Sequence, residues 1–164
     1  MARILILAGG CRGRRLAREL AEEGLALRIT TRTQANRAAI EAAGAACWIG
    51  TPERLATLRG ALENVTLVCW LLGGAVGSGA DVRALHTARL RFFLGQVIDT
   101  TVRGFIYEAR GSRVPAKVLA EGERLVRAAG ERNALPVSIL TADPAAEDAW
   151  RADALGAVRT LLGT

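Results

Sequence analysis

The chain of 164 residues is poor in the residue types that build metal sites and disulfides. It contains one histidine, one tyrosine and one lysine, and its three cysteines form no Cys-x-x-Cys pair. A zinc site needs about four clustered cysteine or histidine ligands, and an odd number of cysteines cannot all pair within one chain. We therefore expect no metal site and no complete disulfide framework.

Long apolar runs are missing as well. None approaches the roughly 18–20 residues that are needed to cross a bilayer. The apolar start of the chain stops at Gly9, which is short of a secretory core of about 7–15 apolar residues followed by a cleavage site. These absences favour a cytoplasmic protein that has no membrane partner.

The charge balance is dominated by arginine. The net charge of +6 arises from 21 arginines and a single lysine, Lys117. Such a balance can indicate nucleic-acid binding, but the arginines are dispersed and fall mostly on the outward faces of predicted helices. A nucleic-acid partner is therefore disfavoured. A chain that is 51% hydrophobic and 23% charged fits one globular domain over residues 1–164.

Apolar runs and helical patterns alternate along the chain. Strands are expected at residues 3–8, 25–31, 46–49, 66–72, 103–108 and 136–141. Helices are expected at residues 13–23, 33–43, from Thr51-Pro52-Glu53 onward, 81–98 with a break near His86-Thr87, 115–133, and from Asp143-Pro144 to residue 162. This alternation predicts an α/β fold with three layers, in which helices cover a doubly wound, parallel, six-stranded Rossmann sheet of order 3-2-1-4-5-6.

The most informative segment is Ala8-Gly9-Gly10-Cys11-Arg12-Gly13, between the first strand and the first helix. It fits the Gly-x-Gly-x-x-Gly fingerprint with Ala8 in place of the first glycine. Gly10 would let the backbone approach a pyrophosphate, and Gly13 would let the helix pack closely on the strand. The helix N-terminus adds free amides and a positive dipole end. The segment predicts a dinucleotide site, and a glycine turn without a ligand is the alternative.

The residues that follow the second strand indicate which dinucleotide is bound. An acid at this position would bind the 2′-hydroxyl of NAD, whereas an arginine accommodates the 2′-phosphate of NADP. The strand ends in Thr31-Arg32, which favours NADP(H) over NAD(H). Arg12 and Arg37 would add positive charge near the same phosphate. The alternative is that Arg32 is a solvated cation at the strand end.

Other strand ends border the same predicted crevice. Gly50 follows the third strand, while Leu72 and Gly73 close the fourth. Ligands of open α/β sheets bind at the carboxyl ends of the strands. We therefore expect these three residues to contact the adenine and ribose, on their position alone.

Residues 4–32 (ILILAGGCRGRRLARELAEEGLALRITTR) resemble the cofactor-binding start of the atypical and extended short-chain dehydrogenases, the NAD-dependent epimerase/dehydratase group. Residues 102–107 (VRGFIY) and 135–140 (LPVSIL) look like that group's fifth and sixth strands. The resemblance implies a Rossmann fold, a bound nicotinamide dinucleotide and a redox or isomerase ancestry. It also implies a truncated member with a single domain, because the substrate-binding extension of that group has no counterpart here.

The chain departs from that group at the catalytic positions. Active members resembling the group use a Tyr-x-x-x-Lys pair for proton exchange, but here Gly111 stands four residues after Tyr107, and Lys117 stands ten residues after it. Tyr107 and Glu108 are the remaining candidates for proton transfer beside a nicotinamide ring. The favoured interpretation is that Tyr107 packs against the next helix and Glu108 pairs with a nearby arginine. His86 has no evident partner and is expected on a helix surface.

The sequence therefore predicts an NADP(H)-binding Rossmann protein, and three versions of it stay open. The first is an oxidoreductase that acts on a small-molecule substrate, in which Phe92 or Phe93 faces outward for a homodimer contact. The second is a non-enzymatic dinucleotide sensor or scaffold protein. The third is a Rossmann scaffold that binds no nucleotide, because the Ala8 methyl group crowds the tight turn.

Overall fold

The expected Rossmann sheet is present in the computed structural model, which describes residues 1–8 and 10–164. Its six strands are all parallel and lie in the order β3-β2-β1-β4-β5-β6, which confirms the predicted topology. The strands are β1 (Arg3–Leu7), β2 (Ala26–Thr31), β3 (Ala45–Ile49), β4 (Leu67–Trp70), β5 (Gly104–Glu108) and β6 (Val137–Leu140).

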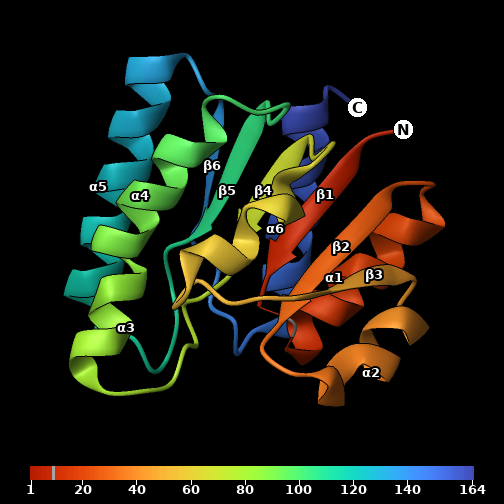
Figure 1. The fold of residues 1–164 in the computed structure, drawn as a ribbon, viewed down its shortest axis with the longest axis horizontal. Coiled ribbons are helices and arrows are strands. Elements are labelled where there is room, and N and C mark those ends of the chain that lie inside the picture. Colours follow the sequence, from red (N-terminus) through yellow and green to blue (C-terminus); the bar gives the residue numbers. More distant parts are fainter. Residues whose placement is uncertain (9) are drawn as a thin grey trace.

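Helices cover both faces of this sheet (Figure 1). They are α1 (Cys11–Glu22), α2 (Arg37–Ala42), α3 (Gly79–Leu85), α4 (Ala88–Val97), α5 (Ala116–Asn133) and α6 (Glu147–Leu162). Helices α1 and α6 pack together, and α4 packs on α5. The break between α3 and α4 at residues 86–87 was expected from the sequence.

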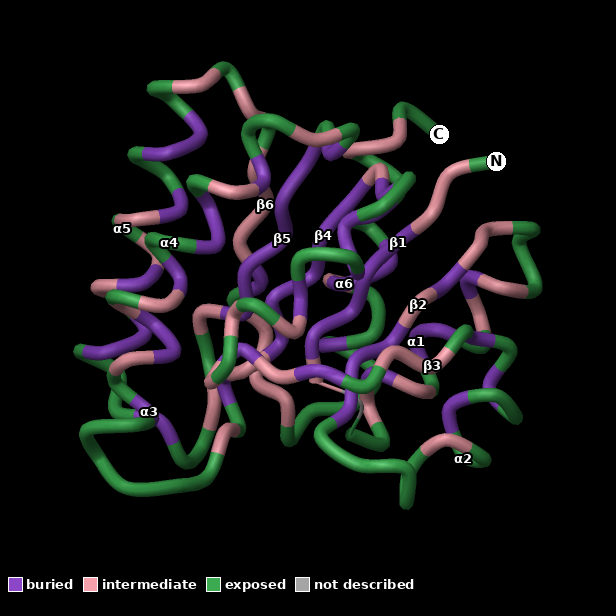
Figure 2. The backbone as a smooth tube through the Cα atoms, viewed as in Figure 1, coloured by how far each residue is buried: buried purple, intermediate pink, exposed green. Residues whose placement is uncertain are grey.

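A hydrophobic core lies on each face of the sheet, and the side chains of β1 contribute alternately to the two cores. Successive side chains of a strand point to opposite faces of the sheet. Ile4 and Ile6 therefore pack with buried residues of α1 and α6, whereas Leu5 and Leu7 pack with those of α4 and α5. Because β1 is covered on both faces, it reads as an uninterrupted apolar run, and Figure 2 shows the burial concentrated in the central strands and the inward faces of the helices.

The connection between β3 and β4 differs from the expectation. The helix predicted to begin at Thr51-Pro52-Glu53 is replaced by two short 3₁₀ segments, Leu55–Leu58 and Gly60–Leu62. The Trp48 indole donates a hydrogen bond to the Thr57 carbonyl at 2.7 Å. The Thr57 hydroxyl accepts one from the Thr51 backbone N–H at 2.9 Å. The first bond engages the Thr57 carbonyl, which an α-helix beginning at Thr51 would have paired internally.

Of the two adjacent phenylalanines on α4, only one faces outward, as expected. Phe93 is fully buried, whereas Phe92 is 57% exposed. The use of Phe92 as a homodimer contact stays a prediction. Among the described helices, none is both long and apolar enough to cross a membrane.

Candidate functional site

The turn between β1 and α1 has the close packing that its glycine spacing predicts. A β-carbon on Gly13 would lie 2.7 Å from the Ala8 carbonyl oxygen, so only glycine fits between helix and strand. A β-carbon on Gly10 would meet nothing within 4 Å, so the backbone is open to the crevice there. Gly9, the other predicted contact in this turn, lies outside the described residues.

Ala8 adopts a backbone conformation that is unusual for its residue type. Its φ of 93° lies in the region that side chains other than glycine rarely adopt. Such a conformation costs on the order of 1–3 kcal/mol when the surrounding structure imposes it. Ala8 stands where the dinucleotide fingerprint has its first glycine. Its backbone adopts a conformation typical of glycine although the residue carries a methyl group.

Two adjoining cavities lie above this turn. One, of about 280 Å³, is lined by the turn, by the loop after β4 and by Trp150 of α6. The second, of about 590 Å³, extends over the ends of β2 and β3 and is of a size that small ligands occupy, which is about 300–1,000 Å³. The two cavities share the lining residues Ala8, Gly10, Cys11, Leu72 and Ala75. Together they form one crevice at the carboxyl edge of the sheet.

Most of the predicted contacts line this crevice. Those that do are Ala8, Gly10, Cys11, Arg12, Gly13, Thr31, Arg32, Gly50 and Leu72. Gly73 is not in the lining, because its backbone N–H points to Glu108 at 2.8 Å. Arg37 is also outside it and instead bonds to Gln34 at 2.7 Å and to Glu41 at 3.4 Å. The expectation that Arg37 adds charge at the phosphate has no support from this position.

An acid that no sequence motif indicates lies beside Arg32. Glu53 forms an ion pair with the Arg32 guanidinium, and both residues line the larger cavity. The pattern Thr51-Pro52-Glu53 predicts a helix start, and nothing in it indicates that Glu53 lies near the end of β2. The signal for it was the adjacency of β2 and β3, which brings both strand ends to the same edge.

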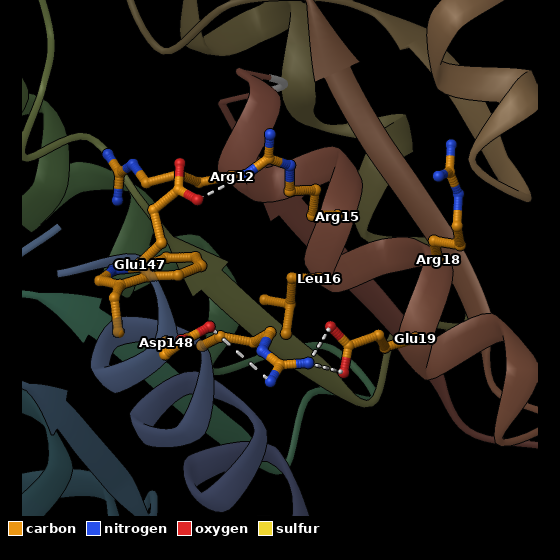
Figure 3. A pocket seen from close by; sticks show the side chains of 9 residues that line it. Arg12, Arg15, Leu16, Arg18, Glu19, Glu147 and Asp148 are labelled. Atoms are coloured by element: carbon orange, nitrogen blue, oxygen red, sulfur yellow. Dashed lines mark hydrogen bonds and ion pairs between the residues drawn. The ribbon is translucent and has the colours of Figure 1, made fainter. Parts of the chain in front are cut away.

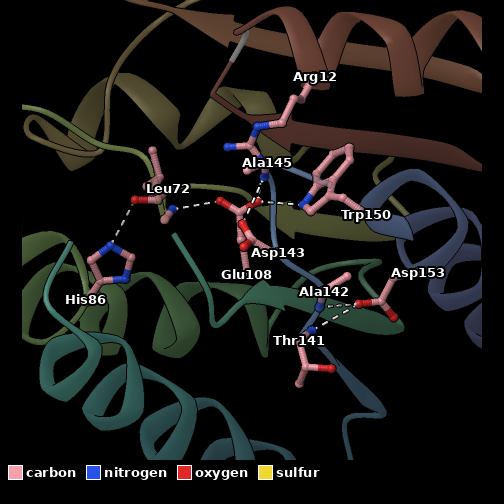
Figure 4. Close-up of polar contacts among 11 residues, drawn as sticks. Arg12, Leu72, His86, Glu108, Thr141, Ala142, Asp143, Ala145, Trp150 and Asp153 are labelled. Carbon is pink, nitrogen blue, oxygen red and sulfur yellow. Dashed lines mark hydrogen bonds and ion pairs between the residues drawn. The ribbon is translucent and has the colours of Figure 1, made fainter. Parts of the chain in front are cut away.

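Glu108 is the most constrained polar residue at this edge. Its carboxylate is fully buried and accepts three hydrogen bonds, as Figure 4 shows in part. Their donors are the Gly73 backbone N–H at 2.8 Å, the Trp150 indole at 2.8 Å and the Arg12 guanidinium at 2.5 Å. The Arg12 guanidinium also lies over the Trp150 ring, 4.8 Å from its centroid. Removing one partner of such a buried pair costs about 3–5 kcal/mol.

Tyr107, the other catalytic candidate, is buried in a second polar network. Its hydroxyl lies 2.7 Å from Nδ1 of His86 and 3.3 Å from the Leu119 carbonyl of α5. Nε2 of His86 lies 3.1 Å from the Leu72 carbonyl. Because a carbonyl can only accept, we assign the imidazole proton to Nε2, so Nδ1 accepts from the Tyr107 hydroxyl. A β-carbon on Gly122 would overlap this hydroxyl, so α5 packs directly on the ring.

His86 is not on a helix surface, and that expectation was wrong. It is fully buried between α3 and α4, and its ring meets Tyr107 edge-on. Burial lowers the pKa of His86 to about 4, although the hydrogen bond to Leu72 opposes the shift. Burial, followed by the charges of Glu123 and Glu108, raises the pKa of Tyr107 well above its ordinary value. Both groups are therefore neutral near neutral pH.

A third hollow lies between α1 and α6, on the other side of Arg12 (Figure 3). Exposed ion pairs cross it, from Arg15 to Glu147 at 2.8 Å and from Arg151 to Glu19 at 3.2 Å. Exposed pairs of this kind contribute about 0–1 kcal/mol. Arg12 and Trp150 line both this hollow and the smaller crevice cavity and so lie between the two.

No protein-family profile matches the sequence, and no curated protein does. Solved structures do match the fold. A candidate NAD-dependent epimerase/dehydratase from Bacillus halodurans is 19% identical with a TM-score of 0.70, over 87% of this chain and 71% of its own. UDP-glucuronic acid 4-epimerase from Bacillus cereus, in complex with NAD, is 14% identical with a TM-score of 0.69, over 86% and 56%. Vestitone reductase from alfalfa is 17% identical with a TM-score of 0.64, over 85% and 56%.

These likenesses confirm the fold expected from the resemblance to the epimerase/dehydratase group. The chain spans about half the length of most of the similar structures, for example 55% of a second Bacillus cereus epimerase structure and 48% of a triphenylmethane reductase from Citrobacter. In the part of the chain that the structure describes, no group of three or more His, Cys, Asp or Glu residues is placed to hold a metal ion.

Relief of the backbone strain at Ala8 is a first prediction. We expect Ala8→Gly to raise the free energy of unfolding by about 1 kcal/mol, because the removed strain exceeds the roughly 0.4–1 kcal/mol that a more flexible unfolded chain costs. Urea denaturation measures the change. Ala152→Gly is the matched control on the exposed face of α6, where glycine should cost about 0.5–1 kcal/mol instead. Destabilisation at both positions would show that Ala8 is not strained.

The single histidine predicts a pH dependence of stability. His86 takes up a proton near 6.5 when unfolded but only near 4 when folded, so in between the unfolded state binds more protons. Stability should therefore fall by about 2 kcal/mol as the pH is lowered from about 7.5 to about 5. Urea denaturation at the two pH values measures this fall, and His86→Gln should remove most of it. An equal fall in His86→Gln would assign the effect to other groups.

Proposed function

We propose that this protein binds a nicotinamide dinucleotide, with NADP(H) preferred over NAD(H), in the crevice over the β1–α1 turn. The observation that carries the proposal is the open backbone at Gly10, which directly precedes α1 and lines both cavities. The first amides of a helix and its dipole attract phosphate groups. The adjoining cavity over β2 and β3 has the size and the position that an adenosine needs.

The preference for NADP(H) rests on Arg32. Its guanidinium lines the larger cavity, where the adenosine ribose would lie, and a planar donor suits a 2′-phosphate. Glu53 partly neutralises this arginine and can also accept a hydrogen bond from a 2′-hydroxyl. We therefore expect a preference for NADP(H) that is set by competition between Glu53 and the 2′-phosphate for one guanidinium.

The positions of Tyr107 and Glu108 favour a non-enzymatic dinucleotide sensor or scaffold over an oxidoreductase. A general acid or base must lie within hydrogen-bond reach of the proton that it transfers. Tyr107 is buried with its hydroxyl on His86, and the Glu108 carboxylate is buried beneath Arg12 and Trp150. Only the oxidoreductase hypothesis includes a small-molecule substrate. Turnover of such a substrate would show that the protein is an enzyme.

The cofactor preference is tested by calorimetric titration with NADPH and NADH. We expect NADPH to bind more tightly, and Arg32→Ala to weaken NADPH by about tenfold or more while changing NADH little, because a charge-assisted bond is lost. Arg37→Ala is the matched control, since it removes the same charge outside the crevice. Equal losses in both variants would mean that long-range charge, and not a contact, sets the preference. If neither nucleotide binds, the proposal fails.

The phosphate position is tested by Gly10→Ala. The free protein has room for this methyl group, so the free energy of unfolding should change by less than about 1 kcal/mol. The methyl group would occupy the space proposed for the pyrophosphate, so affinity should fall by about tenfold or more. Gly156→Ala, which is equally open but lies on α6, should leave the affinity unchanged. Full affinity in Gly10→Ala would place the phosphates elsewhere.

A further inference from the structure

The crevice is lined by the ends of β1, β2 and β3, by the segment after β4 and by Trp150 of α6, and the ends of β5 and β6 take no part in it. In a doubly wound fold, the β1–β3 half and the β4–β6 half each hold one mononucleotide part of a dinucleotide. Of the described residues that line the two crevice cavities, none falls between Leu85 and Trp150 in the sequence. The carboxyl ends of β5 and β6 therefore contribute nothing to the crevice.

Close backbone packing closes the space after β4 and β5. A β-carbon on Gly73 would lie 2.5 Å from the Arg110 carbonyl and 2.7 Å from the Glu108 carboxylate. A β-carbon on Gly111 would overlap the Gly73 carbonyl. The loops after the two strands thus touch through their main chains, and no ring fits between them.

The polar groups along this edge are bonded to one another. The Glu108 carboxylate joins the loop after β4 to α6, as described above. Asp153 accepts hydrogen bonds from the backbone N–H groups of Thr141 and Ala142, at 3.0 and 3.1 Å, just after β6 (Figure 4). Arg110 and Asp143 form an ion pair of 3.3 Å between the loops after β5 and β6. The backbone N–H groups of Gly73, Thr141 and Ala142 are therefore already bonded within the protein.

Arg12 and Trp150 form the end wall of the open half. The guanidinium is held on one side by Glu108 and lies over the indole ring. A β-carbon on Gly74 would lie 3.5 Å from Nη2 of Arg12, so this nitrogen faces the loop that lines the smaller cavity. A positive group therefore stands where the cavity stops, and its planar donors suit the last phosphate of a ligand.

We propose that the crevice is a half-site that recognises the adenosine diphosphate part of its ligand and leaves whatever is joined to the second phosphate outside the protein. The proposal rests on the proposed function and narrows it. On this proposal, ADP-ribose and 2′-phospho-ADP-ribose are ligands of the same site and bind as well as the complete dinucleotides. The nicotinamide ring of a bound dinucleotide lies in solvent.

The test compares wild-type affinities for matched pairs by calorimetry. The pairs are NADP⁺ with 2′-phospho-ADP-ribose, and NAD⁺ with ADP-ribose, and nicotinamide mononucleotide is the reference for the other half. We expect the two members of each pair to bind within about threefold of one another, because a ring that stays hydrated adds no affinity. Nicotinamide mononucleotide should neither bind nor compete at millimolar concentration.

A second readout follows the ring directly. The fluorescence of reduced nicotinamide should keep its free intensity and full access to a soluble quencher when NADPH is bound. Arg32→Ala should weaken NADPH and 2′-phospho-ADP-ribose by the same factor, since both ligands place the 2′-phosphate alike.

Three results would overturn the half-site. A dinucleotide that binds more than about tenfold more tightly than its ADP-ribose partner would show that the ring is held, and the proposed function would stand. Shielding of bound NADPH from the quencher would show the same. Failure of all four adenine ligands to bind would remove the half-site and the proposed function together.

Discussion

A fully buried carboxylate on Glu108 organises the functional edge of this protein. A charge can be buried only where donors replace its lost water. Here the donors come from three distant segments, namely the first turn of α1 through Arg12, the loop after β4 through Gly73, and α6 through Trp150. Because each donor sits on a different element, satisfying the carboxylate sets the relative positions of these elements. The geometry of the crevice follows from this bond network.

The same network divides the two halves of the sheet. On the β1–β3 side the glycine turn leaves an open crevice with a helix N-terminus above it. On the β4–β6 side, main-chain contact between Gly73 and Gly111 and the ties around Glu108 fill the corresponding space. Tyr107 and His86 extend the closed side into the core, where their desolvation keeps both side chains neutral. A fold that is symmetric in its two halves thus supports an asymmetric site.

The strand order and most element positions could be predicted from local patterns. A central parallel strand such as β1 is covered on both faces, so its apolar run signals its place without knowledge of its neighbours. The connection after β3 could not be predicted in this way. Thr51-Pro52-Glu53 has the composition of a helix start, but Trp48 and Thr57 bind the backbone groups of that segment across the loop. Side-chain hydrogen bonds across the loop prevailed over the local helix propensity.

The candidate site shows the same division. Local residue patterns were enough to predict the sheet, the position of the β1–α1 turn and the need for Gly13, because close helix–strand packing leaves a signature in residue spacing. The tertiary structure alone decided that Glu53 faces Arg32, that His86 is buried on Tyr107, and that the far half of the crevice is closed. Each of these depends on pairs of side chains or loops that meet only when the sheet is assembled, and no periodicity or motif in a single chain records such meetings.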